Sequence, residues 1–330
     1  MFNEKLIDTA GAGKEARSRL VNADCVQVLE TLEAGSIDVV VTSPPYNLGV
    51  DYNSYDDSMS REAYLKWTLE WATAVKRVLR DSGSVFLNLG SKPTDPWVPF
   101  EVVMQLRELF CLQNVIHWIK SISIEQKDVG VNYEGITQDI TVGHYKPINS
   151  KRYLNDCHEY VFHLTKQGSV ELDRLAVGVP YQDKTNVARW KAGGQDRHCR
   201  GNTWFVPYKT IRSRELQRPH PASFPIELAR KCIRLAGLPQ ADGSGTVLDP
   251  FLGIGHTAIA AAFCGVDFLG IELDAEYYAV ACSEVERACQ PAATGQQRKA
   301  AKKAADEPTN GLSPGPQGAE APVDSQLLLF

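Results

Sequence analysis

The sequence has no apolar run long enough to span a membrane. The longest one, residues 258–263, is far shorter than the roughly 20 residues that a membrane helix needs. Residues 1–14 contain no apolar stretch of the kind found in secretory signals. We therefore expect a cytoplasmic protein without a membrane partner. At 330 residues, of which 43% are hydrophobic and 23% charged, the chain can bury one large core with an insertion, or two modest cores.

Cysteine pairs at metal-binding spacing are also absent. The eight cysteines are scattered without a C-x-x-C pair, which argues against a zinc ribbon and for a reducing compartment. Cys157-His158 and His198-Cys199 have no second pair at ligand spacing, so the sequence predicts no metal site. His163 lies in a strand-like run and is expected to be a hydrogen-bonded core residue.

A general excess of basic residues is missing as well. The chain has 35 Lys and Arg against 40 Asp and Glu, so 35 − 40 gives a net charge of −5, which argues against a general nucleic-acid coat protein. Residues 183–218 differ from this average, because nine basic side chains there accompany three acidic and four aromatic ones. The segment is either a solvated loop or a surface for phosphates and bases. For the second alternative, the candidate DNA-binding residues are Lys184, Arg189, Arg197, Arg200, Arg212 and Arg214.

Strand and helix patterns alternate along much of the chain. Short β-branched runs predict strands over 36–42, 84–89, 113–119, 246–248 and 267–271. Apolar residues at helical spacing predict helices over 60–79, 225–236, 256–264 and 275–288. This order predicts an α/β fold with a mostly parallel sheet. The alternation is lost over 123–219, and the composition after residue 290, rich in Ala, Pro and Gly, predicts a disordered tail.

A glycine-containing turn between a predicted strand and a predicted helix is the first chemical motif. It begins at Asp249 and contains Gly253 and Gly255. Glycines let the backbone approach a ligand closely, and the helix N-terminus offers unpaired N–H groups. Glu272 follows Asp249 by 272 − 249 = 23 residues, where an acid can take both hydroxyls of a ribose. Position 258 is alanine, so the third glycine of a dinucleotide site is missing, which favours a nucleoside ligand without a diphosphate.

The second motif, Thr42-Ser43-Pro44-Pro45-Tyr46, directly follows a predicted buried strand. Two consecutive prolines hold the chain extended and leave their carbonyls without local amide partners. A fixed carbonyl beside a hydroxyl can accept both hydrogens of an exocyclic amine, and Tyr46 can stack on the ring that carries the amine. Open α/β sheets bind their ligands at strand C-termini. The alternative is a loop that only ends the strand.

Both motifs resemble those of the amino-methylating DNA methyltransferases, which modify N4 of cytosine or N6 of adenine. The T-S-P-P-Y block precedes the D-P-F-x-G-x-G block, which is similar to the β-type motif order. The resemblance implies a Rossmann-like S-adenosylmethionine-dependent methyltransferase fold, with helices on both faces of a mostly parallel sheet and an inserted target-recognition region. It divides the chain into a catalytic half over 1–122, a DNA-binding insert over 123–219, a cofactor-binding half over 220–289 and the tail over 290–330.

The resemblance also assigns roles to individual residues, with S-adenosyl-L-methionine as the cofactor. The catalytic tetrad is matched by Ser43, Pro44, Pro45 and Tyr46. Asp24 matches the acid that contacts the cofactor adenine, Glu272 matches the ribose acid, and Phe224 lies in the segment before the helix that closes the cofactor pocket. The usual Ser and Thr of the glycine turn are replaced, which leaves Thr257 as the candidate donor to the cofactor carboxylate. The turn itself is matched by Asp249, Phe251, Gly253 and Gly255.

Serine rather than aspartate begins the tetrad, and by resemblance this form is associated with N4-cytosine methylation; N6-adenine methylation is the alternative. The amine is buried in a base pair, so the nucleotide must be flipped out of the duplex. No cysteine follows a proline, so the nucleophile of C5-cytosine enzymes is missing and no covalent intermediate is expected. Two other classes stay open: a methyltransferase for RNA or a small molecule, and a nonenzymatic DNA-binding relative. The latter would be expected to lack Tyr46 or Glu272, and both are present.

The tail carries a short apolar motif. Residues 324–330 read Asp-Ser-Gln-Leu-Leu-Leu-Phe, and consecutive apolar residues are unexpected in a polar, disordered segment. The side chains that resemble the clamp-binding peptide of bacterial replication and repair proteins are Gln326, Leu327, Leu329 and Phe330. The preceding linker would be a flexible tether; the alternatives are a segment that folds back on this protein, or no role. The family resemblance implies double-stranded DNA as substrate and a prokaryotic or phage-encoded protein on the nucleoid. It leaves open a restriction endonuclease of the same system as a partner.

Overall fold

A computed structural model gives the fold of residues 2–11, 14–129, 136–143, 150–189, 195–207 and 223–290. By its internal contacts the chain divides into two units, Met1–Cys289 and Gln290–Phe330. All the elements named below belong to the first unit. The tail with its predicted clamp peptide lies outside the described residues, as do Arg212 and Arg214.

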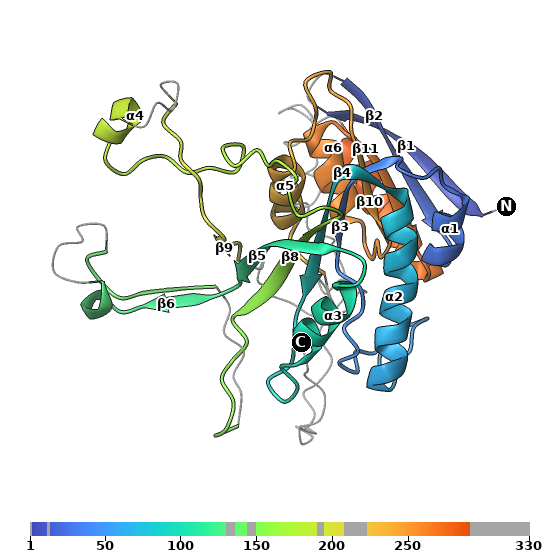
Figure 1. The fold of residues 1–330 in the computed structure, drawn as a ribbon, viewed down its shortest axis with the longest axis horizontal. Coiled ribbons are helices and arrows are strands. Elements are labelled where there is room, and N and C mark those ends of the chain that lie inside the picture. Colours follow the sequence, from blue (N-terminus) through green and yellow to red (C-terminus); the bar gives the residue numbers. More distant parts are fainter. Residues whose placement is uncertain are drawn as a thin grey trace, which may run out of the picture. The chain divides into compact units, whose positions relative to one another are not determined.

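A nine-stranded sheet forms the centre of the first unit (Figure 1). Its strands are β1 (Asn3–Gly11), β2 (Lys14–Asn22), β3 (Ile37–Thr42), β4 (Leu79–Leu89), β5 (Cys111–Ile119), β8 (His158–Thr165), β9 (Thr203–Phe205), β10 (Thr246–Asp249) and β11 (Asp267–Glu272). The spatial order is β1-β2-β11-β10-β3-β4-β8-β5-β9. The strands from β2 to β4 in this order are parallel, whereas β8 lies antiparallel between β4 and β5. A separate two-stranded sheet pairs β6 (Ile122–Ile124) with β7 (Ile140–Val142).

The two ends of the first unit interleave within this sheet. β10 pairs in parallel with β3 on one side, through Val247 opposite Val39, and with β11 on the other. β11 then pairs in parallel with β2. Since parallel neighbours end at the same edge of a sheet, the turn after β10 and the loop after β3 meet there, although about two hundred residues of sequence separate them. The position of both sequence motifs follows from this pairing.

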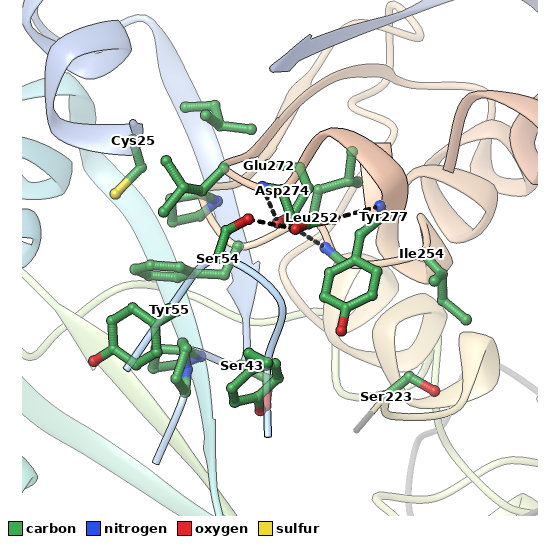
Figure 2. A pocket seen from close by; sticks show the side chains of 18 of the residues that line it. Cys25, Ser43, Ser54, Tyr55, Ser223, Leu252, Ile254, Glu272, Asp274 and Tyr277 are labelled. Atoms are coloured by element: carbon green, nitrogen blue, oxygen red, sulfur yellow. Dashed lines mark hydrogen bonds between the residues drawn. The ribbon is translucent and has the colours of Figure 1, made fainter. Parts of the chain in front are cut away.

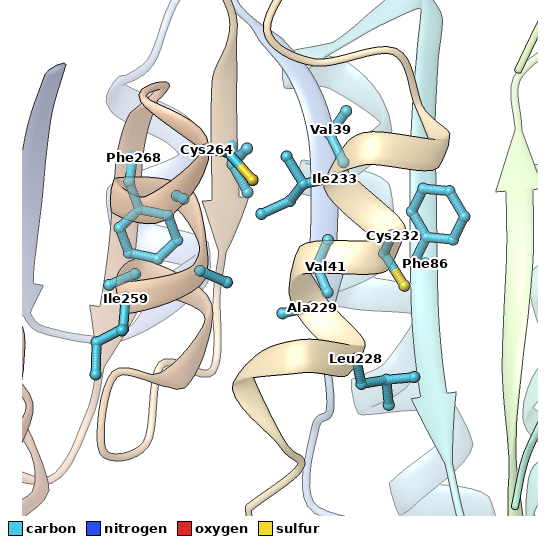
Figure 3. Packing of buried hydrophobic residues seen from close by; sticks show 14 of the residues in the cluster. Val39, Val41, Phe86, Leu228, Ala229, Cys232, Ile233, Ile259, Cys264 and Phe268 are labelled. Atoms are coloured by element: carbon cyan, nitrogen blue, oxygen red, sulfur yellow. The ribbon is translucent and has the colours of Figure 1, made fainter. Parts of the chain in front are cut away.

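Helices cover both faces of the sheet, as expected for a mostly parallel sheet. One face packs against α1 (Cys25–Thr31), α2 (Arg61–Val78) and α3 (Val98–Leu106). The other packs against α5 (Ile226–Leu235), α6 (His256–Cys264) and α7 (Ala275–Cys289). Figure 3 shows the second core, in which one side of α5 faces β3 and β4; the side chains in contact with the strands include Leu228, Ala229, Cys232 and Ile233. The predicted α/β fold with helices on both faces is therefore confirmed.

The predicted strands and helices are all present, with ends that shift by a few residues, and α6 has the bounds expected from sequence. The β1–β2 hairpin was not predicted, because its strands carry charged residues such as Lys5 and Arg19 that give no clear apolar alternation. Part of the region 123–219 belongs to the main sheet, to which it contributes β8 and β9. β8 is buried among β4 and β5, and only the segments around it stand apart, as β6 and the short α4 (Thr185–Arg189) do in Figure 1. Among the described residues, no helix combines the length and apolar character needed to cross a membrane.

His163 on β8 is a satisfied core histidine, as predicted. The ring is fully buried and stacks on Phe86, with 4.7 Å between ring centroids. Its Nδ1 lies 3.0 Å from the Asn114 amide nitrogen, and its Nε2 lies 3.0 Å from Ser84 Oγ. Burial lowers the pKa of the imidazole to about 4, because the charged form loses its hydration.

This pKa makes the stability of the fold depend on pH. In the unfolded chain the histidine pKa is near 6.5, so the unfolded state takes up the proton first as the pH falls. The contribution of the buried, neutral His163 ring to the unfolding free energy is therefore complete above pH 6.5 and is lost as the pH falls towards 4. Between pH 7 and 5, wild type should lose about 2 kcal/mol more unfolding free energy than His163→Gln, which cannot take up this proton. Urea unfolding of both proteins at several pH values measures the difference; parallel pH profiles would contradict it.

Candidate active site

A cavity of about 1040 Å³, part of it open to solvent, lies at the edge of the sheet where β3, β10 and β11 end. Figure 2 shows Glu272, Asp274 and Tyr277 converging on one side of this cavity and Ser43 and Tyr55 on another. The residues predicted from sequence that line it are Asp24, Ser43, Pro44, Pro45, Tyr46, Phe224, Phe251, Gly253, Thr257 and Glu272. The catalytic and cofactor motifs therefore share one cavity.

Asp249, predicted as part of the cofactor turn, is not among the lining residues. Its carboxylate is buried and accepts hydrogen bonds from the Thr42 hydroxyl at 2.7 Å, the Thr257 hydroxyl at 2.6 Å and the Phe251 amide at 3.1 Å. Burial raises the pKa of this carboxyl to about 6, while the hydroxyl donors oppose the shift. Asp249 thus ties the end of β3 to the beginning of α6 and fixes the turn between them.

The glycine turn leads directly into α6. Gly253 and Gly255 have φ values of 53° and 87°, a region that side chains rarely adopt. A Cβ at Gly255 would lie only 3.1 Å from Val285 Cγ2, so the turn can pack on α7 only without a side chain there. The first N–H groups of any helix have no partner within the helix, and those of α6 begin at the cavity, where His256 and Thr257 line the wall. This arrangement can bind an anionic group.

Thr257 lines the cavity, but its hydroxyl hydrogen is engaged. The hydroxyl donates to Asp249 Oδ2 at 2.6 Å, and a hydroxyl has one hydrogen to donate. Its oxygen can still accept, and its backbone N–H belongs to the open end of α6. If Thr257 is a donor to a ligand carboxylate, as expected from the sequence, the donor is therefore this backbone N–H and not the hydroxyl.

Glu272 closes β11 and is half-buried at the cavity wall. Oε2 accepts from the Gly253 amide at 2.7 Å and Oε1 from the Asp274 amide at 2.9 Å. Burial raises the pKa of the carboxyl to about 7, although these two amides favour the charged form. Each oxygen keeps a lone pair that can accept from a ligand hydroxyl.

The loop after Tyr46 forms a wall of the cavity that sequence reasoning missed. Asp57, near the end of this loop, accepts from the amides of Asn47 at 2.7 Å, Leu48 at 3.0 Å and Val50 at 2.9 Å at its beginning, which folds the loop on itself. The Ser54 hydroxyl then donates to Asp274, at the start of α7. Further lining residues absent from the predictions are Tyr52, Tyr55, Trp67, Asp274 and Tyr277. The aromatic residues clustered after the second motif are the signal that could have found part of this wall.

The Ser43–Tyr46 segment is held by hydrogen bonds at both ends. Ser43 Oγ lies 2.6 Å from the Tyr46 hydroxyl. The buried Tyr64 of α2 donates from its hydroxyl to the Pro45 carbonyl at 2.9 Å. Asp24, which also lines the cavity, caps α1 by accepting from the Gln27 amide at 3.1 Å. A fixed hydroxyl and a stackable aromatic ring thus stand beside the cavity that holds the glycine turn.

The basic residues predicted to bind DNA have local partners. Lys184 forms an ion pair with Asp196 at 2.5 Å. Arg197 donates to the Gly178 carbonyl at 2.8 Å and Arg200 to the Val177 carbonyl at 2.9 Å, so both hold the backbone of their loop. Arg189 is exposed at the end of α4. No cluster of three His, Cys, Asp or Glu that could hold a metal occurs among the residues the structure describes.

The fold and this cavity are those of an α/β protein that can bind a ligand at the strand ends, beside the Ser43–Tyr46 segment. Comparison with known families then identifies the chain. It belongs to the DNA methylase family of N6 and N4 methyltransferases, whose model matches residues 37–283.

Individual relatives agree with this family. The chain is 28% identical over 267 residues to the Type II methyltransferase M.HpaI of Haemophilus parainfluenzae, covering 80% of this chain and 72% of that protein. It is 26% identical over 270 residues to the DNA adenine methyltransferase YhdJ of Escherichia coli K12, covering 80% and 81%. The structure of the cytosine-N4-specific PvuII DNA methyltransferase matches with a TM-score of 0.57 and 18% identity, covering 92% of this chain and 94% of that one, which shows a shared fold.

The chain is therefore a DNA methyltransferase for N6 of adenine or N4 of cytosine, with S-adenosyl-L-methionine as its methyl donor. The cavity fits this cofactor on three observations. The open end of α6 can take a carboxylate, the Glu272 oxygens can take the ribose hydroxyls, and the walls are rich in aromatic side chains that can contact a base.

The raised pKa of Glu272 gives a prediction for the cofactor-free protein. An acid whose pKa rises from 4.5 to about 7 on folding stabilises the fold most below pH 4.5, and this contribution is lost as the pH rises through 7. Glu272→Gln does not titrate, so its stability relative to wild type should rise by roughly 2 kcal/mol between pH 5 and pH 8. Urea unfolding at each pH measures this change. A stability difference that stays constant with pH would contradict the assigned environment of the carboxyl.

Proposed function

We propose that this enzyme transfers a methyl group from S-adenosyl-L-methionine to N4 of a cytosine flipped out of duplex DNA. The observation that carries the proposal is a hydroxyl, and not a carboxylate, at the first position of the tetrad, beside the cofactor cavity. By resemblance, this Ser43 form is associated with N4-cytosine methylation. The matching fold of a cytosine-N4-specific enzyme agrees with it.

Each wall of the cavity has a part in the proposed chemistry. The cofactor supplies an electrophilic methyl group when bound. The exocyclic amine is a weak nucleophile because its lone pair is delocalised into the ring. Ser43 Oγ and the Pro44 carbonyl accept its two hydrogens, and Tyr46 stacks on the base, so the lone pair is directed at the methyl group. Orientation and electrostatics provide the catalysis, without a covalent intermediate.

The cofactor assignments follow from the donors and acceptors present. Glu272 accepts from the ribose hydroxyls, and the α6 N–H groups, including that of Thr257, donate to the cofactor carboxylate. Asp24 lies where it can accept from the adenine amine, and Phe224 closes the pocket. Asp249 is a positioning residue, because its hydrogen bonds fix the glycine turn without reaching the cavity.

The basic residues around α4 are proposed to contact the DNA backbone. Arg189 is exposed, and Arg197 and Arg200 each keep guanidinium hydrogens beyond the single bond that holds their loop. Lys184 would exchange its ion pair with Asp196 for a phosphate. Arg212 and Arg214 are proposed for the same surface from the sequence alone.

N6-adenine methylation is the second candidate function. The family includes both chemistries, and one relative, YhdJ, is named as an adenine methyltransferase. Both amines are exocyclic, so the same acceptors can orient either one.

The product base tests the proposal. Wild type incubated with duplex DNA and the cofactor, followed by mass spectrometry of the nucleosides, should yield N4-methylcytosine, whereas an RNA duplex of the same sequence should yield no product. Tyr46→Ala should lower turnover at least about tenfold, the scale of one lost base stack, with cofactor affinity unchanged. N6-methyladenine would establish the second candidate, and methylation of RNA alone would refute the DNA substrate. Wild-type turnover by Tyr46→Ala would refute the stacking role.

Two partners are proposed in addition to DNA. A restriction endonuclease of the same system is supported by the relative M.HpaI, which is named a Type II methyltransferase. Co-expression with an endonuclease that cuts the same recognition sequence only when it is unmethylated should leave the host chromosome intact. A bacterial sliding clamp is proposed for the tail, with Gln326 as a polar anchor and Leu327, Leu329 and Phe330 as the apolar contacts.

The clamp proposal is tested with a synthetic peptide of residues 325–330. Calorimetric titration into purified clamp should show binding, and a peptide of the same composition in scrambled order should not bind. A variant lacking residues 326–330 should methylate naked oligonucleotides at the wild-type rate, since the clamp is absent there. No binding by the peptide, or slow methylation by the shortened variant, would assign the tail another role.

A further inference from the structure

A polar cluster lies behind the Ser43–Tyr46 segment and outside the set of residues that line the cavity. Its centre is Glu159 on β8, whose side chain is 12% exposed. Asn88, on the neighbouring β4, is 4% exposed and lies at the end of the strand, opposite Val161 of β8. Lys120 follows β5, one residue beyond its end, where β5 and β8 pair. Three strands thus bring these groups to the site.

The contacts connect Glu159 to the tetrad. Lys120 Nζ donates to Glu159 Oε1 at 3.0 Å, so this oxygen is paired with a cation. The other oxygen, Oε2, accepts from Asn88 Nδ2 at 2.7 Å and from the Tyr46 hydroxyl at 3.2 Å. Asn88 Nδ2 also donates to the Tyr46 hydroxyl at 2.7 Å, and this hydroxyl lies 2.6 Å from Ser43 Oγ.

Tyr46 and Glu159 both pack closely against Gly90. A Cβ at Gly90 would lie 3.0 Å from Tyr46 Cε2 and 3.1 Å from Glu159 Cδ. Asn88 Oδ1 is buried without a hydrogen-bond partner among the described residues, so the contacts of Nδ2 alone set the orientation of this amide. If the amide turned round, its oxygen would face the Glu159 carboxylate, and two acceptors would repel each other.

The number of hydrogens available determines which atom donates in each hydrogen bond of the cluster. A carboxylate only accepts, and Asn88 Nδ2 only donates. The Tyr46 oxygen accepts from Asn88, and its single hydrogen goes to the ionised Glu159, because a hydrogen bond to a charged acceptor is stronger than one to a hydroxyl. The hydrogen between Ser43 and Tyr46 must then be that of Ser43. Ser43 Oγ therefore presents lone pairs to the cavity.

We propose that Glu159 is a positioning residue for methyl transfer, which acts through Tyr46 to hold Ser43 Oγ as a hydrogen-bond acceptor for the target amine. The inference rests on the proposed function, in which Ser43 accepts an amine hydrogen. Without Glu159, the Tyr46 hydrogen turns to Ser43, and the Ser43 hydrogen is free to point at the amine, where it opposes the amine hydrogens. Lys120 holds one carboxylate oxygen in an ion pair, and Asn88 fixes the Tyr46 oxygen.

The first test is Glu159→Gln, which keeps the shape but replaces one acceptor with a donor. Steady-state kinetics with duplex DNA should show kcat reduced at least about tenfold, while KM for DNA and Kd for S-adenosyl-L-methionine change less than about threefold. In the Tyr46→Phe background, which lacks the connecting hydroxyl, adding Glu159→Gln should lower kcat no further. Wild-type kcat in the single variant, or a full additional loss in the double variant, would overturn the proposal.

A rescue and a control separate positioning from stability. In Glu159→Gln the glutamine must turn an N–H group either to Tyr46 or to the Lys120 cation. Adding Lys120→Met removes the cation, so the glutamine N–H group can turn to that side and the glutamine oxygen can again accept from Tyr46. The double variant should therefore recover part of the lost kcat. The control is Asp38→Asn, which alters a different buried acid. Asp38 lies on β3, in the half of the strand away from Ser43, and accepts from the Thr246 amide at 2.8 Å. This substitution should lower the melting temperature but keep kcat.

The outcomes distinguish this inference from the proposed function. If wild type methylates no DNA, the proposed function fails, and Glu159 has no reaction to assist. If wild type is active and Lys120→Met/Glu159→Gln is no faster than Glu159→Gln, the orientation argument is wrong. If Asp38→Asn loses kcat as Glu159→Gln does, the effect is one of stability, and the positioning role is refuted.

Discussion

The active site depends on one buried carboxylate. Asp249 accepts hydrogen bonds from Thr42 at the end of β3 and from Thr257 at the start of α6, residues that lie far apart in sequence. Burying a carboxylate is unfavourable, as its raised pKa of about 6 records, and three hydrogen bonds offset that cost only in the correct geometry. The Ser43–Tyr46 segment and the glycine turn face one cavity because this acid joins the two elements that carry them.

The sheet provides the frame in which this contact can form. β10 lies between β3 and β11, so strands from the two ends of the first unit alternate within one parallel ladder. Residues 1–122 and 220–289 therefore share a sheet and two cores, and neither part could bury its strands without the other. The catalytic and cofactor halves are divisions of the sequence, whereas the cooperative folding unit contains both.

Local patterns in the sequence predicted five strands of the main sheet and four of the helices around it, since a buried strand or an amphipathic helix is visible in a few consecutive residues. They also predicted the Ser43–Tyr46 segment and Glu272, because each directly follows such a strand. Local patterns could not predict the hydrogen bonds and strand pairings that join different parts of the fold. The hydrogen bond from the Thr257 hydroxyl to Asp249, which leaves only the backbone N–H of Thr257 as a donor, is one such contact. Ser54 reaches Asp274, 220 residues away, and no local pattern reports this pairing. The strand-like run that contains His163 is β8, but its place in the main sheet comes from pairing with β4 and β5, which lie earlier in the chain.

Two buried acids, Asp249 and Glu159, stand behind the cavity and act on hydroxyls that face it or adjoin it. Asp249 accepts a hydrogen bond from the Thr257 hydroxyl, and in our proposal Glu159 accepts one from the Tyr46 hydroxyl. A hydroxyl whose hydrogen is engaged can only accept. At the Thr257 end of the cavity the backbone N–H groups at the start of α6 can still donate, while Ser43 supplies an acceptor at the other motif. The proposed ligands need donors and acceptors in different places. The cofactor carboxylate needs N–H donors, and the amine of the target base needs an acceptor. The specificity of the site then depends on which hydroxyl hydrogens are already engaged in hydrogen bonds as much as on which side chains line the wall.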